Sequence, residues 1–220
     1  MPTKGGDSGG PARASRTYRG LPPHGKGQAI GLFGGTFNPP HAGHRHASLF
    51  ELRRLGLDQL WWMVTPGNPL KKNGGLPALD ARMRAAAEIA AHPRIAISGA
   101  EAGFRTRYTA DLIQILKKRR PATRFVWIMG SDSLTEFHRW ENWQRLAGSV
   151  PIAVVNRPRS LPAPLSSRAA LGLARYRVDA DDSKTLPNCD PPAWVFLIGP
   201  RIKASSTAIR SARGRGVLKR

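Results

Sequence analysis

The stretch GLFGGTFNPPHAGH, residues 31–44, decides which fold and which site we expect from this chain. The apolar run 29–33 that leads into it has the length of a buried strand, and a helical pattern follows over 43–55. Gly34 and Gly35 carry no Cβ, so backbone N–H groups of the turn between strand and helix can approach an anion closely. The positive end of the helix would point at the same place. The stretch therefore predicts a strand, an anion-binding turn and a helix.

Two histidines of this stretch, His41 and His44, lie three residues apart. On the first turn of a helix this spacing lets both imidazoles face one way, where they can donate hydrogen bonds to phosphate oxygens. Taken alone, the glycine pair is typical of any tight turn between a strand and a helix, and the histidines could bind a metal or cap the helix. The stretch lacks the GxxxxGK[ST] spacing of a P-loop and the GxGxxG spacing of a dinucleotide site, so neither class applies.

Apolar runs of strand length alternate with helical patterns along the rest of the chain. Further strands are expected over 60–65, 95–98, 124–129, 152–155 and 194–198, with a weak one over 175–178. Further helices are expected over 79–91, 109–119 and 134–146, with a short one from about Ser206 onwards. Because most strands are continuous apolar runs, the pattern predicts a Rossmann-like, doubly wound α/β fold, with a mostly parallel sheet and helices on both faces. Ligands of such sheets bind at the carboxyl ends of the strands.

The 220 residues are enough to bury the core of one domain. Residues 1–27 are rich in Gly, Pro, Ser and Arg without a hydrophobic period, so we expect a disordered basic leader there and a single domain over 28–220. The single cysteine, Cys189, excludes an intramolecular disulfide framework. No apolar run has the length that crosses a bilayer and no secretory signal is recognisable, so we expect a cytoplasmic protein without a membrane partner.

The chain is strongly basic, with 35 Lys and Arg against 14 Asp and Glu and a net charge of +21. The ends carry about half of this imbalance, because residues 1–28 hold five basic residues and one acidic, and residues 201–220 hold seven basic and none acidic. Such a charge points toward anionic partners and predicts incidental attraction of nucleic acid at low salt. A nucleic-acid-binding protein without catalysis is one alternative, although no RRM, KH, zinc-finger or helix-turn-helix pattern supports it.

The string GGTFNPPHAGH resembles the signature of the nucleotidyltransferases that carry a T/HxGH motif, and specifically that of bacterial nicotinate-nucleotide adenylyltransferases. Four more segments resemble that family in the expected order: YTADL at 108–112, MGSDSLTEFHRWENWQRL at 129–146, VVNRPR at 154–159 and ASSTAIR at 204–210. Arg159 departs from the pattern, because it stands where the family usually has glycine. The resemblance runs from about Ala29 to Arg210. It implies a nucleotidyltransferase-type fold that transfers AMP from ATP to nicotinic acid mononucleotide and releases deamido-NAD and pyrophosphate.

The resemblance also implies which residues bind each substrate. ATP would be bound by Gly34, Gly35, Thr36, Phe37, His41, His44, Asp132, Ser205, Ser206, Thr207 and Arg210. Nicotinic acid mononucleotide would be bound by Thr36, Tyr108, Thr109 and Trp140. The indole of Trp140 would stack on the pyridine ring, although Trp143 could take that part and leave Trp140 in the core. Backbone N–H groups around Tyr108 and Thr109 would suit the nicotinate carboxylate.

Three of these assignments have a plainer structural alternative. Asp132 could accept hydrogen bonds from a ribose or a base, or it could belong to the cap of the helix that follows. Lys71 in the loop NPLKK could reach the phosphates as a flexible point charge, but Lys72 could do the same and either lysine could simply be solvated. The hydroxyls over 205–207 with Arg210 one turn on form either a phosphate clamp on a C-terminal helix or a capped surface helix.

The implied reaction needs no nucleophilic side chain. The phosphate of the mononucleotide is already ionised and attacks the α-phosphorus of ATP in line, without a covalent intermediate, so catalysis comes from positioning and charge neutralisation. His41, His44, Lys71 and Arg210 would supply the donors. Mg²⁺ would be held by phosphate oxygens and water rather than by a protein ligand. Alternative acceptors within the class are the amidated mononucleotide and pantetheine phosphate, and both a monomer and a homo-oligomer are compatible with the sequence.

Overall fold

The computed structural model describes residues 14–67, 75–106, 108–156, 163–199 and 206. Its strands are β1 (Thr17–Tyr18), β2 (Ala29–Gly35), β3 (Gln59–Val64), β4 (Ile95–Ser98), β5 (Arg124–Gly130), β6 (Ile152–Asn156), β7 (Arg177–Val178) and β8 (Trp194–Ile198). Its α-helices are α1 (Ala42–Arg54), α2 (Leu79–Ala90), α3 (Ala100–Gly103), α4 (Thr109–Arg119), α5 (Ser131–Glu136), α6 (Trp143–Ala147) and α7 (Arg168–Gly172). Short 3-10 helices are η1 (Phe137–Arg139), η2 (Ala163–Ser166), η3 (Ala174–Tyr176) and η4 (Ser183–Asn188).

The described strands form one sheet in the order β1-β4-β3-β2-β5-β6-β8-β7, and all neighbours pair in parallel. The chain runs from β2 outward to β3 and β4, then returns across the sheet to β5 on the other side of β2. The carboxyl ends of β2 and β5 therefore flank the point where the strand order reverses, which is where such sheets bind ligands. The predicted Rossmann-like, doubly wound fold is confirmed.

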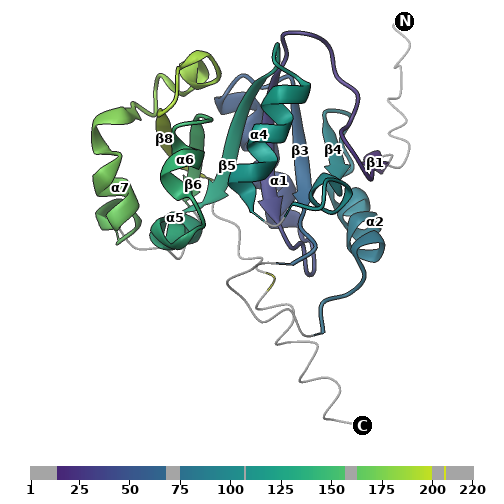
Figure 1. The fold of residues 1–220 in the computed structure, drawn as a ribbon. Coiled ribbons are helices and arrows are strands. Elements are labelled where there is room, and N and C mark those ends of the chain that lie inside the picture. Colours follow the sequence, from purple (N-terminus) through teal and green to yellow (C-terminus); the bar gives the residue numbers. More distant parts are fainter. Residues whose placement is uncertain (1–13, 68–74, 107, 157–162, 200–205, 207–220) are drawn as a thin grey trace, which may run out of the picture.

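Each face of the sheet carries its own hydrophobic core. On one face, Phe33 and Trp62 pack with side chains of α1 and α2. On the other face, Leu32, Trp61 and Trp127 pack with side chains of α4 and α6, and Figure 1 shows α4 crossing in front of the strands. Burial on both faces explains why the strands are continuous apolar runs in the sequence.

The expected leader over 1–27 needs a correction, because the fold already includes the chain from Ala14 on. Strand β1 pairs with β4 at one edge of the sheet, and the backbone N–H of Ile97 donates to the carbonyl oxygen of Arg16 at 2.9 Å. A two-residue edge strand is held by backbone hydrogen bonds rather than by an apolar pattern, so composition did not reveal it. Residues 1–13 lie outside the described residues.

The expected helix over 134–146 is wrong as a single element. The structure breaks it into α5, η1 and α6, with extended backbone at Trp140 and a left-handed conformation at Asn142 (φ 54°). Asparagine tolerates that conformation better than most residues, so the chain can turn there without glycine or proline. Between β6 and β8, the described residues form α7 and the short 3-10 helices η2, η3 and η4, and the weak strand expected over 175–178 is shortened to β7. None of the described helices has the length and apolar character needed to cross a membrane.

Candidate active site

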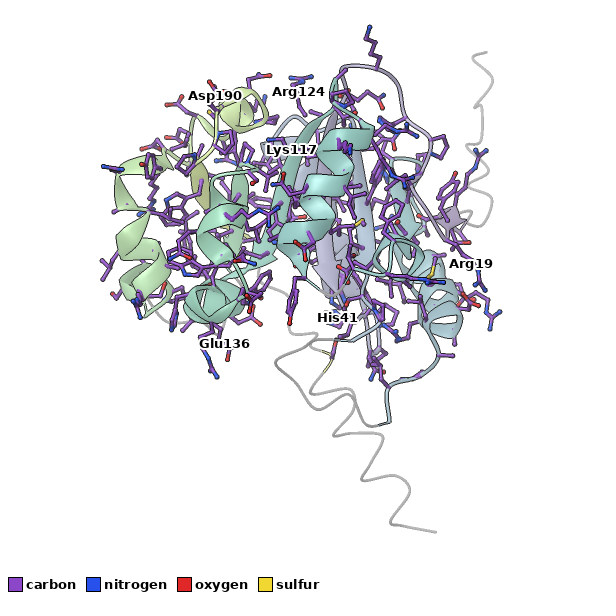
Figure 2. All side chains as sticks on the ribbon, in the orientation of Figure 1. Arg19, His41, Lys117, Arg124, Glu136 and Asp190 are labelled. Atoms are coloured by element: carbon purple, nitrogen blue, oxygen red, sulfur yellow. The ribbon has the colours of Figure 1, made fainter. Side chains whose placement is uncertain are left out.

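The two predicted imidazoles lie side by side at the N-terminus of α1. Their ring centroids are 3.8 Å apart, and His41 is the N-cap residue with extended backbone. The backbone N–H of His44 donates to the carbonyl oxygen of His41 at 2.9 Å, and the backbone N–H of His41 donates to Nδ1 of His44 at 3.2 Å. Figure 2 shows His41 at the end of the sheet opposite Arg124, the first residue of β5. The pair therefore stands at the carboxyl edge of the sheet, where the sequence predicted a phosphate site.

The hydrogen bond to Nδ1 fixes what His44 can offer a ligand. A ring nitrogen that accepts a hydrogen bond carries no proton, so the proton of the neutral imidazole is on Nε2. His44 is only 8 % exposed, which holds this arrangement away from bulk water. An imidazole in this tautomer has an Nε2–H, which is the kind of donor that an anionic phosphate oxygen accepts.

An aromatic cluster of Phe33, Phe37 and Trp62 supports the imidazole of His44. The rings of Phe37 and Trp62 are stacked with centroids 4.8 Å apart, and the centroid of Phe37 lies 5.0 Å from that of His44. The indole N–H of Trp62 donates to Oγ of Ser48 on α1 at 2.8 Å, which ties the cluster to the helix. Phe37 is 2 % exposed. Its side chain therefore lies in the core, so a contact between Phe37 and a nucleotide would have to be made by its backbone.

Gly34 lies next to the site, near the carboxyl end of β2, and the indole of Trp127 packs against it. A Cβ at this residue would lie 2.5 Å from Cη2 and 2.7 Å from Cζ2 of Trp127, so the indole covers the strand where a side chain would stand. Trp127 also lies edge-on to Trp140, with ring centroids 6.4 Å apart. The end of β2 therefore lies between the imidazole pair on the α1 side and Trp140 on the α4 side, and Trp127 contacts both Gly34 and Trp140.

Replacing Gly34 with alanine is expected to lower the free energy of unfolding by about 1–3 kcal/mol, because the new methyl group overlaps the buried indole. Urea denaturation measures this change. Gly20→Ala is the matched control, because a Cβ at Gly20 meets nothing within 4 Å, and it should stay within about 0.5 kcal/mol of the wild type. A Gly34→Ala protein as stable as the control would contradict the packing described here.

Three of the four residues expected to bind the mononucleotide lie at α4 or at the end of η1, and the fourth, Thr36, directly follows β2. Tyr108 is the N-cap residue of α4 and Thr109 its first residue. Trp140 is half-buried and lies edge-on to Phe137, with centroids 5.4 Å apart. Trp143 is half-buried too and lies edge-on to the same ring at 5.7 Å. The two indoles therefore share Phe137, and only Trp140 also reaches Trp127.

The carboxyl ends of β5 and β6 are joined by a contact that the sequence did not predict. Oγ of the fully buried Ser131 donates to Oδ1 of Asn156 at 3.0 Å. Asp132, next in the chain, is exposed in the first turn of α5, whose N-cap residue is Gly130. The capping alternative for Asp132 is therefore wrong, and its carboxylate is accessible from solvent.

The closing motif reaches this site through Ser206. Its hydroxyl donates to the carbonyl oxygen of Pro39 at 2.9 Å, and Pro39 lies two residues before His41. The other members of the predicted set, Lys71, Ser205, Thr207 and Arg210, lie outside the described residues.

Sequence reasoning missed two charged residues behind the site, Arg82 and Glu101. Arg82 is 4 % exposed on α2 and donates hydrogen bonds to loop carbonyls. An arginine next to Met83 on the buried face of an Ala-rich helix was the signal that could have revealed it. Burial raises the pKa of Glu101 on α3 to about 6, and a hydrogen bond with the Thr65 side chain opposes that rise.

The raised pKa of Glu101 predicts a pH dependence of stability. The folded chain holds this proton more tightly than the unfolded chain, whose carboxyl titrates near 4.5, so the free energy of unfolding falls as pH rises from about 4.5 to 6. Glu101→Gln should remove about 1–2 kcal/mol of that fall. Urea titrations of both proteins at pH 4.5 and pH 7 measure it. An equal difference between the two proteins at both pH values would contradict the prediction.

Comparison with known proteins agrees with this fold. The arrangement defines an α/β protein of the nucleotidyltransferase class, and the family described as "Cytidylyltransferase-like" matches residues 32–212. A probable nicotinate-nucleotide adenylyltransferase of Bradyrhizobium sp. (strain ORS 278) is 55 % identical over 185 residues, which cover 84 % of this chain and 96 % of that protein. The corresponding protein of Rhizobium meliloti (strain 1021) is 50 % identical over 185 residues, 84 % and 98 % of the two chains. The chain belongs to the nicotinate-nucleotide adenylyltransferase family.

Solved structures share the architecture at much lower identity. The nicotinic acid mononucleotide adenylyltransferase of Plasmodium falciparum complexed with APC superposes with a TM-score of 0.57 and 15 % identity, over 84 % of this chain and 83 % of that one. The same enzyme complexed with NaAD gives a TM-score of 0.55 at 14 % identity, with the same coverage. These structures support the fold.

Proposed function

We propose that the protein transfers the adenylyl group of ATP to nicotinic acid mononucleotide, giving deamido-NAD and pyrophosphate in NAD biosynthesis. The observation that carries the proposal is the pair of imidazoles, 3.8 Å apart at the N-terminus of α1 and beside the turn that ends β2. The names of the curated relatives support the same activity. The proposal includes a cytoplasmic location, where ATP is available to the reaction.

The geometry suits a direct transfer between two anions. An oxygen of the mononucleotide phosphate attacks the α-phosphorus of ATP, and the bond from that phosphorus to the pyrophosphate oxygen breaks. The attacking phosphate is ionised at neutral pH, so no general base is needed. The Nε2–H of His44, with His41 and the positive end of α1, stabilises the charge that gathers on the phosphate oxygens in the transition state. Lys71 and Arg210 are further cations for the leaving pyrophosphate.

ATP occupies the α1 side of the site in this proposal. Gly34 and Gly35, which end β2 rather than forming the expected turn, and Thr36 after them offer their backbone to its phosphates, and the backbone of Phe37 continues that surface. Asp132 accepts hydrogen bonds from the ribose or the base, since its carboxylate is exposed at the carboxyl edge. In the proposal Ser205, Ser206, Thr207 and Arg210 also bind the phosphates, and the contact of Ser206 with Pro39 supports this part of the assignment.

Nicotinic acid mononucleotide occupies the α4 side. Trp140, held edge-on by Trp127 and Phe137, offers the face of its indole to the pyridine ring. The first-turn N–H groups of α4 around Tyr108 and Thr109 have no intrahelical acceptor and suit the nicotinate carboxylate. Thr36 lies between the two substrates, at the end of β2.

Mg²⁺ fits this site as an ion that the nucleotide brings. No group of three or more His, Cys, Asp or Glu side chains that could hold a metal is found within the described ranges, and the imidazoles and backbone N–H groups here are donors rather than oxygen ligands. The ion would therefore be held by phosphate oxygens and water. Bound in that way, it neutralises phosphate charge during the transfer.

Pyrophosphate release with ATP, Mg²⁺ and a nucleotide acceptor tests the proposal. We expect turnover with nicotinic acid mononucleotide and a higher kcat/KM for it than for the amidated mononucleotide or for pantetheine phosphate. A higher kcat/KM for either of those acceptors would show that the proposed substrate is wrong but that the protein is still an adenylyltransferase. Absence of turnover with all three would overturn the proposed function in favour of a protein that only binds.

A further inference from the structure

The guanidinium of Arg82 is buried behind the turn that carries the candidate phosphate site. The side chain projects from α2 and the residue is 4 % exposed. Nε donates to the carbonyl oxygen of Pro77 at 2.9 Å, and Nη1 donates to those of Thr36 at 2.8 Å and Thr65 at 2.7 Å. Nη2 lies 3.4 Å from the carbonyl oxygen of Pro66. One side chain therefore holds two loops, the one after β2 and the one after β3.

The contact with Thr36 fixes the direction of the next peptide N–H. The peptide bond between Thr36 and Phe37 is trans, and in a trans peptide the C=O and N–H groups point in opposite directions. Because the Thr36 carbonyl points at the guanidinium, the N–H of Phe37 points away from it. Phe37 itself has a positive φ of 46°, which a bulky residue rarely adopts, so the surroundings must hold this backbone in place.

Arg82 also brings a charge that no described carboxylate neutralises. No ion pair joins it to an acidic side chain in the part of the chain that the structure describes, and the guanidinium donates its hydrogen bonds to carbonyl dipoles. Glu101 touches the same loop through the hydroxyl of Thr65. Burial lowers the pKa of Arg82, but a guanidinium keeps its proton at neutral pH. A buried cation in this place favours anions at the turn in front of it.

We propose that Arg82 is a positioning residue for adenylyl transfer: it holds the Thr36 and Thr65 carbonyls so that the N–H of Phe37, just past the end of β2, faces the phosphates, and it adds a fixed positive charge behind this backbone. The proposal rests on the proposed function. Arg82 touches no reacting atom and acts through the loop backbone. A misplaced turn leaves binding largely intact but loses the geometry of the transition state, and such displacement can cost about 10²-fold in rate.

The test compares Arg82→Gln, Arg82→Lys and the matched control Arg84→Gln, which removes an exposed arginine from the same helix. After the wild type has shown turnover, kcat and KM for ATP and for nicotinic acid mononucleotide are measured well below the melting temperature of each variant. We expect Arg82→Gln to lower kcat by about 10²-fold, with KM changing by less than about fivefold. Arg82→Lys should recover only part of the loss, because an ammonium keeps the charge but lacks the planar fork that spans both loops. Arg84→Gln should match the wild type.

Several results would overturn the role of Arg82. One is a folded Arg82→Gln protein with kcat within about threefold of the wild type. Another is full recovery in Arg82→Lys, since a single ammonium cannot hold both loops. A kcat loss that only tracks the folded fraction, or failure of both variants to melt cooperatively, would make Arg82 a stability residue alone. A wild type without turnover is a separate outcome, since it refutes the proposed function first.

Discussion

His44→Ala is expected to lower kcat by about 10²–10³-fold, the scale of a lost oxyanion donor. The substitution removes the Nε2–H that we propose to bind the phosphates and also the Nδ1 acceptor of the His41 N–H. If the donor acts mainly in the transition state, kcat and kcat/KM should fall together while KM changes little. Steady-state pyrophosphate release, with each substrate varied in turn, measures both parameters.

The control for this substitution lies two residues further along the same helix. His46 is exposed, so His46→Ala removes an imidazole from α1 without touching the site, and its kcat should stay within about twofold of the wild type. Thermal melting shows whether His44→Ala stays folded at the assay temperature, since the lost N-terminal contact should cost only about 1 kcal/mol. A rate loss below about fivefold in the folded variant would remove His44 from the catalytic residues.

Phe37→Ala is expected to lower the free energy of unfolding by about 3–5 kcal/mol, because it removes a buried ring that packs on both Trp62 and His44. Phe37→Gly removes the same ring but suits the positive φ of this residue. Glycine should therefore be the less damaging replacement, by about 1 kcal/mol. This order is the reverse of what an ordinary buried residue gives.

Urea denaturation of the wild type and both variants separates the two effects. The mean decrease in the free energy of unfolding of the two variants measures the packing of the ring. The difference between the alanine and glycine variants measures the cost of the backbone conformation. Equal slopes against denaturant are required for the comparison. If Phe37→Ala were the more stable of the two, the left-handed backbone at Phe37 would be refuted.

Most of the sheet could be predicted because its strands are apolar on both faces and its helices have clear ends. The strands 95–98 and 194–198 and the helix 109–119 have the bounds that the sequence predicted. In the helix, Leu112, Ile113 and Leu116 share one buried face, and basic residues fill its last turn. In these elements the hydrophobic pattern of the sequence agrees with the packing in the fold, so the sequence alone predicts them.

The errors arise where structure depends on contacts between distant residues. Strand β1 exists because β4 offers it backbone partners, and the break after Phe137 depends on aromatic packing around Trp140 and Trp143. In the site, the motif predicted that His41 and His44 can face one way, because residues three apart on a helical turn share a side of the helix. It could not show that the Phe37 ring lies in the core or that Arg82 reaches the Thr36 carbonyl, because these contacts join separate loops. The parts assigned to Lys71 and Arg210 stay predictions.

The two margins of the sheet, β1 and β7, have only two residues each. A longer strand at either edge would expose a row of unpaired backbone N–H and C=O groups, and a second molecule could pair with them and extend the sheet into an aggregate. Such brief margins offer a neighbour almost nothing to dock on. We therefore expect that copies of this enzyme do not join edge to edge through their sheets, even when crowding or bound polyanions neutralise the charge that would otherwise repel them.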